Sequence, residues 1–125
     1  MLPFQPKFRP GESVYGEVVY AVKKAIVAGA LRPGDSFPSV RTLSQELKIN
    51  PNTAHKIVTE LTREGLLEVR SGVGTVIAAS RPASREQRKS LLEGDVERLV
   101  VEARQLGLEA DEVLQAIKTK WNQLS

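Results

Sequence analysis

The sequence predicts a mainly α-helical fold that contains one small β-hairpin. Three features indicate it: a helix with two unlike faces over residues 50–65, two short β-prone runs directly after it, and an apolar heptad pattern nearer the C-terminus. Short helices joined by a tight turn and followed by a hairpin form a winged helix-turn-helix. We therefore expect that domain, with an N-terminal arm, over residues 1–80 and a two-helix domain over residues 81–125.

The helix expected over residues 50–65 carries an apolar stripe on one side and polar groups on the other. Asn50 is a favoured N-cap, Pro51 suits the first helical position, and Gly65 is a natural stop. The apolar stripe consists of Ala54, Ile57, Val58 and Leu61. The polar face consists of Asn52, Lys56, Thr59 and Arg63, with His55 and Glu60 on its flanks. This pattern predicts a helix that packs on a core and presents its other face to a polar partner.

Two helices are expected before it. Ser13 can cap a helix over about residues 14–28, and Ser39 can cap a shorter one over residues 40–47. Between these two helices, Arg32-Pro33-Gly34-Asp35 matches a type II β-turn, because Pro holds its second position and Gly its third. The arm of residues 1–12 contains three prolines, and we expect a partly ordered tail there; the alternative is an ordered arm in which Phe4 and Phe8 pack on the domain surface.

A β-hairpin is expected directly after the two-faced helix. Residues 66–70 and 75–79 are short runs rich in Leu, Val, Ile and Thr. Between them, Gly72 and Gly74 can supply the positive-φ connection of a tight turn. An isolated hairpin is only marginally stable in water, so this one must pack against the helices.

The C-terminal segment predicts two further helices, over about residues 85–106 and 111–123. Apolar residues in the first alternate at spacings of four and three, which is a heptad seam for packing against another helix. Two such helices cannot cover their apolar side chains alone, so we expect a homodimer; the alternative is that the tail folds back onto its own winged helix. The expected dimerisation residues are Leu92, Val96, Leu99, Ala103, Leu106, Val113, Leu114, Ile117 and Trp121.

The composition of the chain limits the classes of function that it can have. The formal net charge is +3, and residues 1–82 hold eleven Lys and Arg against seven Asp and Glu, which favours a polyanionic partner. The chain has no cysteine and a single histidine, and no paired-carboxylate or Gly-rich phosphate signature indicates an enzyme. We therefore expect no catalytic residue, no cofactor and no metal site. No apolar run approaches the ~20 residues of a membrane span, so we expect a cytoplasmic protein with no membrane partner.

Several motifs resemble the GntR family of bacterial transcription regulators. They are Arg32-Pro33-Gly34-Asp35, Pro38-Ser39-x-Arg41-x-Leu43-Ser44, Asn50-Pro51-Asn52-Thr53, Glu64-Gly65-Leu66-Leu67 and Gly72-x-Gly74-Thr75. The short helical tail is similar to that of the YtrA-type subfamily. The resemblance implies a winged-helix homodimer that binds a palindromic operator in double-stranded DNA and usually represses transcription.

The resemblance also implies where DNA is contacted. It assigns Arg41, the first turn of the third helix and the wing tip to the interface, and base readout there falls to Asn52 on adenine and to Lys56 or His55 on guanine. Family members often carry Arg at the position of His55 or Lys56, so the identity of the base does not carry over. The expected DNA-binding residues are Ser39, Arg41, Lys48, Asn52, Thr53, His55, Lys56, Thr59, Arg63, Ser71 and Gly72.

Two further possibilities stay open from the sequence. The same fold can serve as a winged-helix protein-interaction module with no sequence-specific DNA readout. An unknown small-molecule effector can also act on such a regulator, and the junction between the winged helix and the tail is the expected place for it, although no motif marks that junction.

Overall fold

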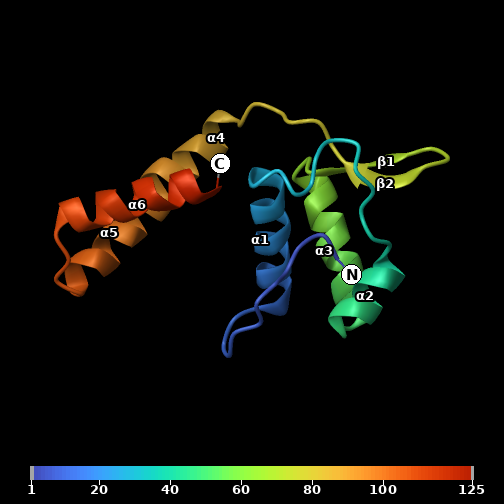
Figure 1. Cartoon of the computed structure of the whole chain (residues 1–125), viewed down its shortest axis with the longest axis horizontal. Helices are drawn as coiled ribbons and strands as arrows, with labels where there is room; N and C mark the ends of the chain where they lie inside the picture. Colours follow the sequence, from blue (N-terminus) through green and yellow to red (C-terminus); the bar gives the residue numbers. More distant parts are fainter. Residues whose placement is uncertain (1, 125) are drawn as a thin grey trace. The chain divides into compact units, whose positions relative to one another are not determined.

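The computed structural model describes residues 2–124, and the chain divides into two compact units, residues 1–80 and 81–125. The first unit contains α1 (Val14–Val27), α2 (Val40–Leu47), α3 (Pro51–Arg63), β1 (Leu67–Arg70) and β2 (Gly74–Ile77). The second contains α4 (Arg85–Lys89), a π-helical segment η1 (Ser90–Asp95), α5 (Val96–Gln105) and α6 (Ala110–Leu124) (Figure 1). The expected fold class, mainly α with a small β-hairpin, is confirmed.

Side-chain caps determine where the helices of the first unit begin. The hydroxyl of Ser13 accepts a hydrogen bond from the backbone N–H three residues further on (3.2 Å), and the hydroxyl of Ser39 does the same (3.1 Å). The side-chain oxygen of Asn50 accepts one from the N–H two residues further on (2.7 Å). Each of these bonds satisfies a donor that the first helical turn leaves without a partner. The three helices therefore begin at the residues that the sequence predicts.

The core of the first unit lies between its helices and the hairpin. α3 packs against α1, α2 and β1. The largest fully buried side chains are Leu43, Ile57, Leu61, Ile77, Val18, Val22 and Val76. Because α3 contributes the two largest of these after Leu43, its rotation about its own axis is fixed by packing.

The wing is a two-stranded antiparallel hairpin. Its register runs from the pair Leu67 and Ile77 to the pair Arg70 and Gly74. β1 begins later than the expected 66–70. β2 begins earlier, with Gly74, and also ends earlier than the expected 75–79. In the turn that connects the two strands, Gly72 has a positive φ of 78°, as the turn requires.

A second segment supports the wing. The expected type II turn forms: Gly34 has φ 91°, and the N–H of Asp35 donates to the carbonyl of Arg32 (3.0 Å). Directly after this turn, Ser36 pairs antiparallel with Val76 of β2. The sequence does not predict this pairing, because a single bridge leaves no periodic pattern.

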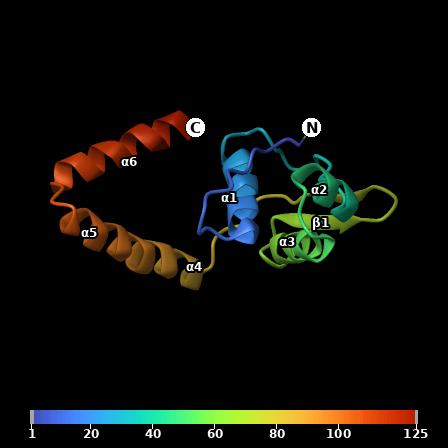
Figure 2. The same ribbon diagram turned by 90° about the horizontal axis from the view of Figure 1, so that it is seen from below.

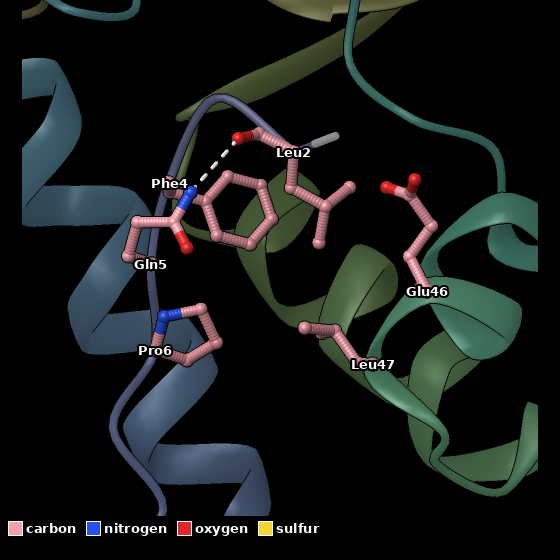
Figure 3. A pocket seen from close by; sticks show the side chains of 6 residues that line it. All are labelled: Leu2, Phe4, Gln5, Pro6, Glu46 and Leu47. Atoms are coloured by element: carbon pink, nitrogen blue, oxygen red, sulfur yellow. Dashed lines mark hydrogen bonds between the residues drawn. The ribbon is translucent and has the colours of Figure 1, made fainter.

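The N-terminal arm corrects an expectation. Leu2 and Phe4 are buried in the core, and the ring of Phe4 stacks on that of Phe37 with centroids 5.7 Å apart. Figure 3 shows the arm on one side of a shallow pocket and residues of α2 on the other. The expectation of a partly ordered tail is wrong for this part of the arm, since two apolar side chains gain enough burial to hold it.

The C-terminal unit corrects a second expectation. A single α-helix over residues 85–106 is expected, but the chain passes through the π-helical segment η1 between α4 and α5. Leu92 lies in η1, where hydrogen bonds run from i to i+5 and each turn holds more residues. The strict heptad seam is therefore interrupted between Leu92 and Val96. Gly107, with φ 77°, follows the end of α5, and α6 extends one residue beyond the expected 111–123 at each end.

α5 and α6 diverge from the turn that joins them, as Figure 2 shows. The carbonyl of Ala103 accepts a hydrogen bond from the N–H of Leu108 (2.9 Å), which closes that turn. No helix within residues 2–124 combines the length and the apolar character needed to cross a membrane.

Candidate nucleic-acid interface

The polar face of α3 is exposed along its whole length. Its exposed residues are Asn52, His55, Lys56, Thr59 and Arg63, and Thr53 beside them is half-buried. On the opposite side of the helix, Ala54, Ile57 and Leu61 are buried. Packing of that side fixes which polar groups point outward, so the face is presented without any rearrangement of the helix.

α2 places three further candidates beside α3. Ser39 caps the start of α2. Its hydroxyl accepts a hydrogen bond from the N–H of Thr42 and donates one to the Thr42 hydroxyl (3.1 Å each). Arg41, the second residue of the helix, is exposed and has no recorded partner within residues 2–124. Lys48 is the C-cap, exposed and in the left-handed region at φ 54°. The backbone of Lys48 thus makes the turn into α3 while its ammonium is free to reach a phosphate.

The wing tip exposes the two expected contact residues and two that were not expected. Ser71 and Gly72 are exposed at the end of the hairpin. Val69 and Val73 on either side of them are also exposed, although both are large apolar residues. Arg70 pairs with Glu68 on the same strand (2.9 Å), which partly neutralises its charge next to the wing tip.

Arg63 has a partner on its own helix. Its guanidinium binds the carboxylate of Glu60 with both Nε and Nη2. The hydrogen bond from Arg63 lowers the pKa of the Glu60 carboxyl below its ordinary value, and the same bond raises the pKa of Arg63. A phosphate contact by Arg63 therefore competes with this ion pair.

Lys56 lies against an aromatic ring of another helix. Its Nζ is 5.4 Å from the centroid of the Tyr15 ring on α1. Burial, followed by the charges of Glu60 and Glu64, raises the pKa of the Tyr15 hydroxyl. The sequence pattern places Tyr15 in the apolar stripe of the first helix and contains no signal for this contact, because nothing local relates residues of α1 and α3. His55, in contrast, has no recorded partner within residues 2–124.

The expected dimerisation residues form an apolar surface on the second unit. Most of them are exposed in the single chain, and Trp121 is 76% exposed. Val113 is half-buried, and Ala103 is the exception, at 6% exposed. An apolar groove lies between the two helices and is lined mainly by Val96, Leu99, Val100, Leu108, Val113, Leu114 and Ile117.

Within residues 2–124, no group of three or more His, Cys, Asp or Glu side chains is placed to hold a metal ion. The first unit carries a set of polar and cationic side chains on α2, α3 and the wing. These side chains lie near one another because α2 and β1 both pack against α3. A protruding helix with this lining can bind the phosphates and base edges of a duplex groove.

Comparison with known proteins gives the same result. The chain matches the family described as "Bacterial regulatory proteins, gntR family" over residues 14–77, which span α1 to β2. It is 34% identical over 113 residues to the uncharacterized HTH-type transcriptional regulator YhcF of Bacillus subtilis (strain 168), covering 90% of this chain and 93% of that relative. It is 31% identical over 111 residues to the HTH-type transcriptional repressor YtrA of the same organism, covering 88% and 85%.

A solved structure shares the fold. The crystal structure of a transcriptional antiterminator from Listeria monocytogenes EGD-e superposes with a TM-score of 0.83 at 22% identity, covering 97% of this chain and 91% of that one. The family match contains α2, the exposed face of α3 and the wing, which are the elements that carry the candidate interface. The chain belongs to the GntR family of bacterial regulatory proteins and is a DNA-binding transcriptional regulator.

Proposed function

We propose that two copies of this chain bind an inverted-repeat operator and repress transcription there, in the cytoplasm and without catalysis. The observation that carries the proposal is the exposed polar face of α3, held outward by an opposite side on which Ala54, Ile57 and Leu61 are buried. The relative YtrA is named a transcriptional repressor, which supports repression over activation.

Base readout belongs to residues near the start of α3 and to Arg41. Asn52 carries an amide that can pair bidentately with adenine, and it is exposed in the first turn of α3. His55 and Arg41 are exposed and have no recorded partner among the described residues 2–124, so each can reach acceptor atoms of guanine. One good bidentate contact discriminates by ~1–3 kcal/mol, so a single copy with so few contacts distinguishes sequences weakly.

Phosphate contacts belong to residues at the edges of the same surface. Lys48, Thr53, Thr59 and the wing residues Ser71 and Gly72 can donate to phosphate oxygens, and the N-terminus of α3 adds free N–H groups and a favourable dipole. Arg63 contributes when a phosphate replaces Glu60 as its partner. These contacts orient the helix on the duplex and make affinity depend on salt.

Homodimerisation is supported by the apolar surface that the tail leaves exposed. Leu99, Leu114, Ile117 and Trp121 are all exposed in the single chain. Burying apolar area stabilises by about 25 cal/mol per Å², and a contiguous exposed surface of this kind marks an interaction site. A second copy presents the same surface, so a two-fold contact can cover both.

Dimerisation supplies the affinity that one α3 lacks. Two linked α3 helices can occupy half-sites about one helical turn apart, and the second contact then occurs at a high effective concentration. This is the reason for expecting an inverted repeat rather than a single half-site.

The test is selection of bound sequences from random duplex DNA by the full chain. We expect enrichment of one inverted repeat, with affinity that falls steeply as salt rises. A scrambled duplex of equal length and composition is the control. Equal binding of both duplexes would contradict sequence-specific readout and would favour the winged-helix protein-interaction module as the function.

A further inference from the structure

The contact between Tyr15 and Lys56 joins the first turn of α1 to the second turn of α3. Its 5.4 Å separation, from Nζ to the ring centroid, lies within the range of about 6 Å over which an aromatic face attracts an ammonium. Tyr15 is half-buried and packs against the core, so its ring is held in place by the fold. Lys56 is exposed and has a long flexible stem, so the ring restricts the lysine and not the reverse.

The neighbouring carboxylates do not compete for this ammonium. Glu60 is bound by Arg63, and Glu64 is bound by Lys23 of α1 at 2.9 Å. Within residues 2–124, the ring of Tyr15 is the recorded partner of Lys56. The two ion pairs leave Lys56 as a cation with its charge uncompensated beside the exposed face of α3.

The position of Lys56 on the helix decides which part of a duplex it can reach. Three residues before it lies Thr53 and four after it lies Glu60, and both are half-buried, so Lys56 lies on the margin of the exposed face. The ring that holds it belongs to α1, which packs along that side of α3. Asn52 and Thr59 are exposed as well. Lys56 therefore borders the reading surface on the α1 side.

We propose that Lys56 binds a backbone phosphate at the α1 edge of α3, and that Tyr15 is the positioning residue that holds its ammonium there. The inference rests on the proposed function and assigns Lys56 a role within it, since the sequence leaves either Lys56 or His55 as the residue that reads guanine. A lysine acts on phosphate as a point charge, so an ammonium held against a ring keeps that ability. Base readout requires the same ammonium to leave the ring and reach the floor of the groove.

The two roles of Lys56 differ in what a charge deletion does. Loss of a phosphate contact weakens binding to all sequences alike and lowers the slope of log affinity against log salt by about 0.9. Loss of a base contact weakens the preferred sequence selectively. Lys56→Met removes the ammonium and keeps a straight apolar stem, so it separates these outcomes.

The experiment measures the dissociation constants of the full chain for the selected duplex and its scrambled control at four salt concentrations. We expect Lys56→Met to weaken binding to both duplexes by the same factor and to lower the salt slope by about 0.9. We expect Tyr15→Leu to weaken both by about two- to fivefold and Tyr15→Phe, which keeps the ring, to remain close to the wild type. In the Lys56→Met background, Tyr15→Leu should cause no further loss. Tyr20→Leu is the matched control, because Tyr20 lies on the same helix and is 60% exposed.

Several results would overturn the inference. If Lys56→Met erases the preference for the selected duplex, Lys56 reads a base. If Tyr15→Leu weakens binding equally with and without Lys56, Tyr15 acts by another route. An NMR spectrum of the wild type gives a measurement that needs no variant: the ring current of Tyr15 should shift the Cε protons of Lys56 upfield, and unshifted protons would contradict the contact. Failure of the selection to enrich any sequence refutes the proposed operator, and that result is separate from these.

Discussion

Arg41 is an exposed cation on α2, the helix that packs against α3. It occupies the second position of α2, a helix whose start is held by the Ser39 cap, and no side chain within residues 2–124 pairs with it. Its charge contributes nothing to the packing of the core. An unpaired cation on a helix next to α3 is available to bind DNA. Its loss should therefore lower the affinity for DNA and leave the stability of the fold unchanged.

Replacing Arg41 with Ala tests this separation. A lost base or phosphate contact of ~1–3 kcal/mol predicts a roughly five- to 150-fold weaker dissociation constant for the selected duplex. The thermal unfolding midpoint should stay within the error of measurement, since the side chain is exposed. Lys24→Ala, which removes the same charge from the last turn of α1, is the control. Normal DNA binding by the Arg41 variant would remove Arg41 from the interface.

The pair of Glu60 and Arg63 predicts a pH dependence of stability. The folded protein holds the pKa of the Glu60 carboxyl below its ordinary value, so the ionised form is favoured by folding. The contribution is therefore present above the unfolded pKa, about 4.3, and is lost as the pH falls through the lower folded pKa.

Glu60→Gln removes this titration. Between about pH 5 and pH 3, the free energy of unfolding of the variant should fall less steeply than that of the wild type, as measured by urea denaturation at each pH. Glu12→Gln is the control, because Glu12 is exposed and has no recorded ion pair within residues 2–124. Parallel curves for Glu60→Gln and the wild type would show that the ion pair does not affect stability.

At the scale of elements, the first unit depends on segments that have no secondary structure of their own. The arm of residues 2–6 covers the core next to α2, and the segment after the type II turn pairs with β2. These two segments meet at the stacked rings of Phe4 and Phe37. The arm therefore helps to hold α2, and with it Arg41, against α3.

Phe4→Ala should destabilise the first unit strongly. Phe4 is 3% exposed, and truncation of a buried Phe costs about 3–5 kcal/mol. Urea denaturation followed by far-UV circular dichroism measures this loss. Phe8→Ala is the matched control, since Phe8 lies on the same arm and is 47% exposed, and it should cost about 0.5 kcal/mol or less. Equal effects of the two variants would mean that the arm does not pack on the core in solution.

At the scale of the whole molecule, the chain combines a small DNA-binding unit with a tail that leaves its apolar side chains exposed. The tail of one copy lacks the surface to cover them. The interruption of the heptad seam at η1 separates Leu92 from the residues of α5 and α6, so we place the centre of the dimer contact on the groove between these two helices. An effector that relieves repression would have to bind the dimer's two states with different affinity.

Leu99→Asp tests the dimer. Leu99 lines the groove, and a charge there opposes burial against a second copy, so sedimentation velocity at micromolar concentration should change from twice 13.7 kDa to 13.7 kDa. Affinity for the inverted repeat should fall with it, because the second half-site is lost. Val101→Asp is the control: Val101 is 62% exposed on the opposite side of α5 and should leave the dimer intact. A monomeric wild type would refute the dimer and the gain in affinity that it supplies.

Most of the elements could be predicted because their signals are local. Ser39, Asn50 and Pro51 each act on a backbone group within three residues, so the helix starts follow from short stretches of sequence. The apolar stripe of α3 predicted its exposed face in the same way. The site was predictable to the extent that it is this face, with Arg41 and the wing tip beside it, whereas Tyr15 was not, because its ring reaches Lys56 from another helix.

By itself, the sequence determined where most of the helices and the wing form and which side of α3 is buried, since caps, helical spacing and glycine turns act within a few residues. Only the tertiary structure decided that Phe4 stacks on Phe37, that Ser36 pairs with Val76, and that Lys56 is held by Tyr15. These contacts join residues far apart in the chain, and their formation depends on how the helices pack, which no local pattern records. The π-helical segment at residues 90–95 was likewise not predicted, because the heptad spacing there predicts an uninterrupted α-helix.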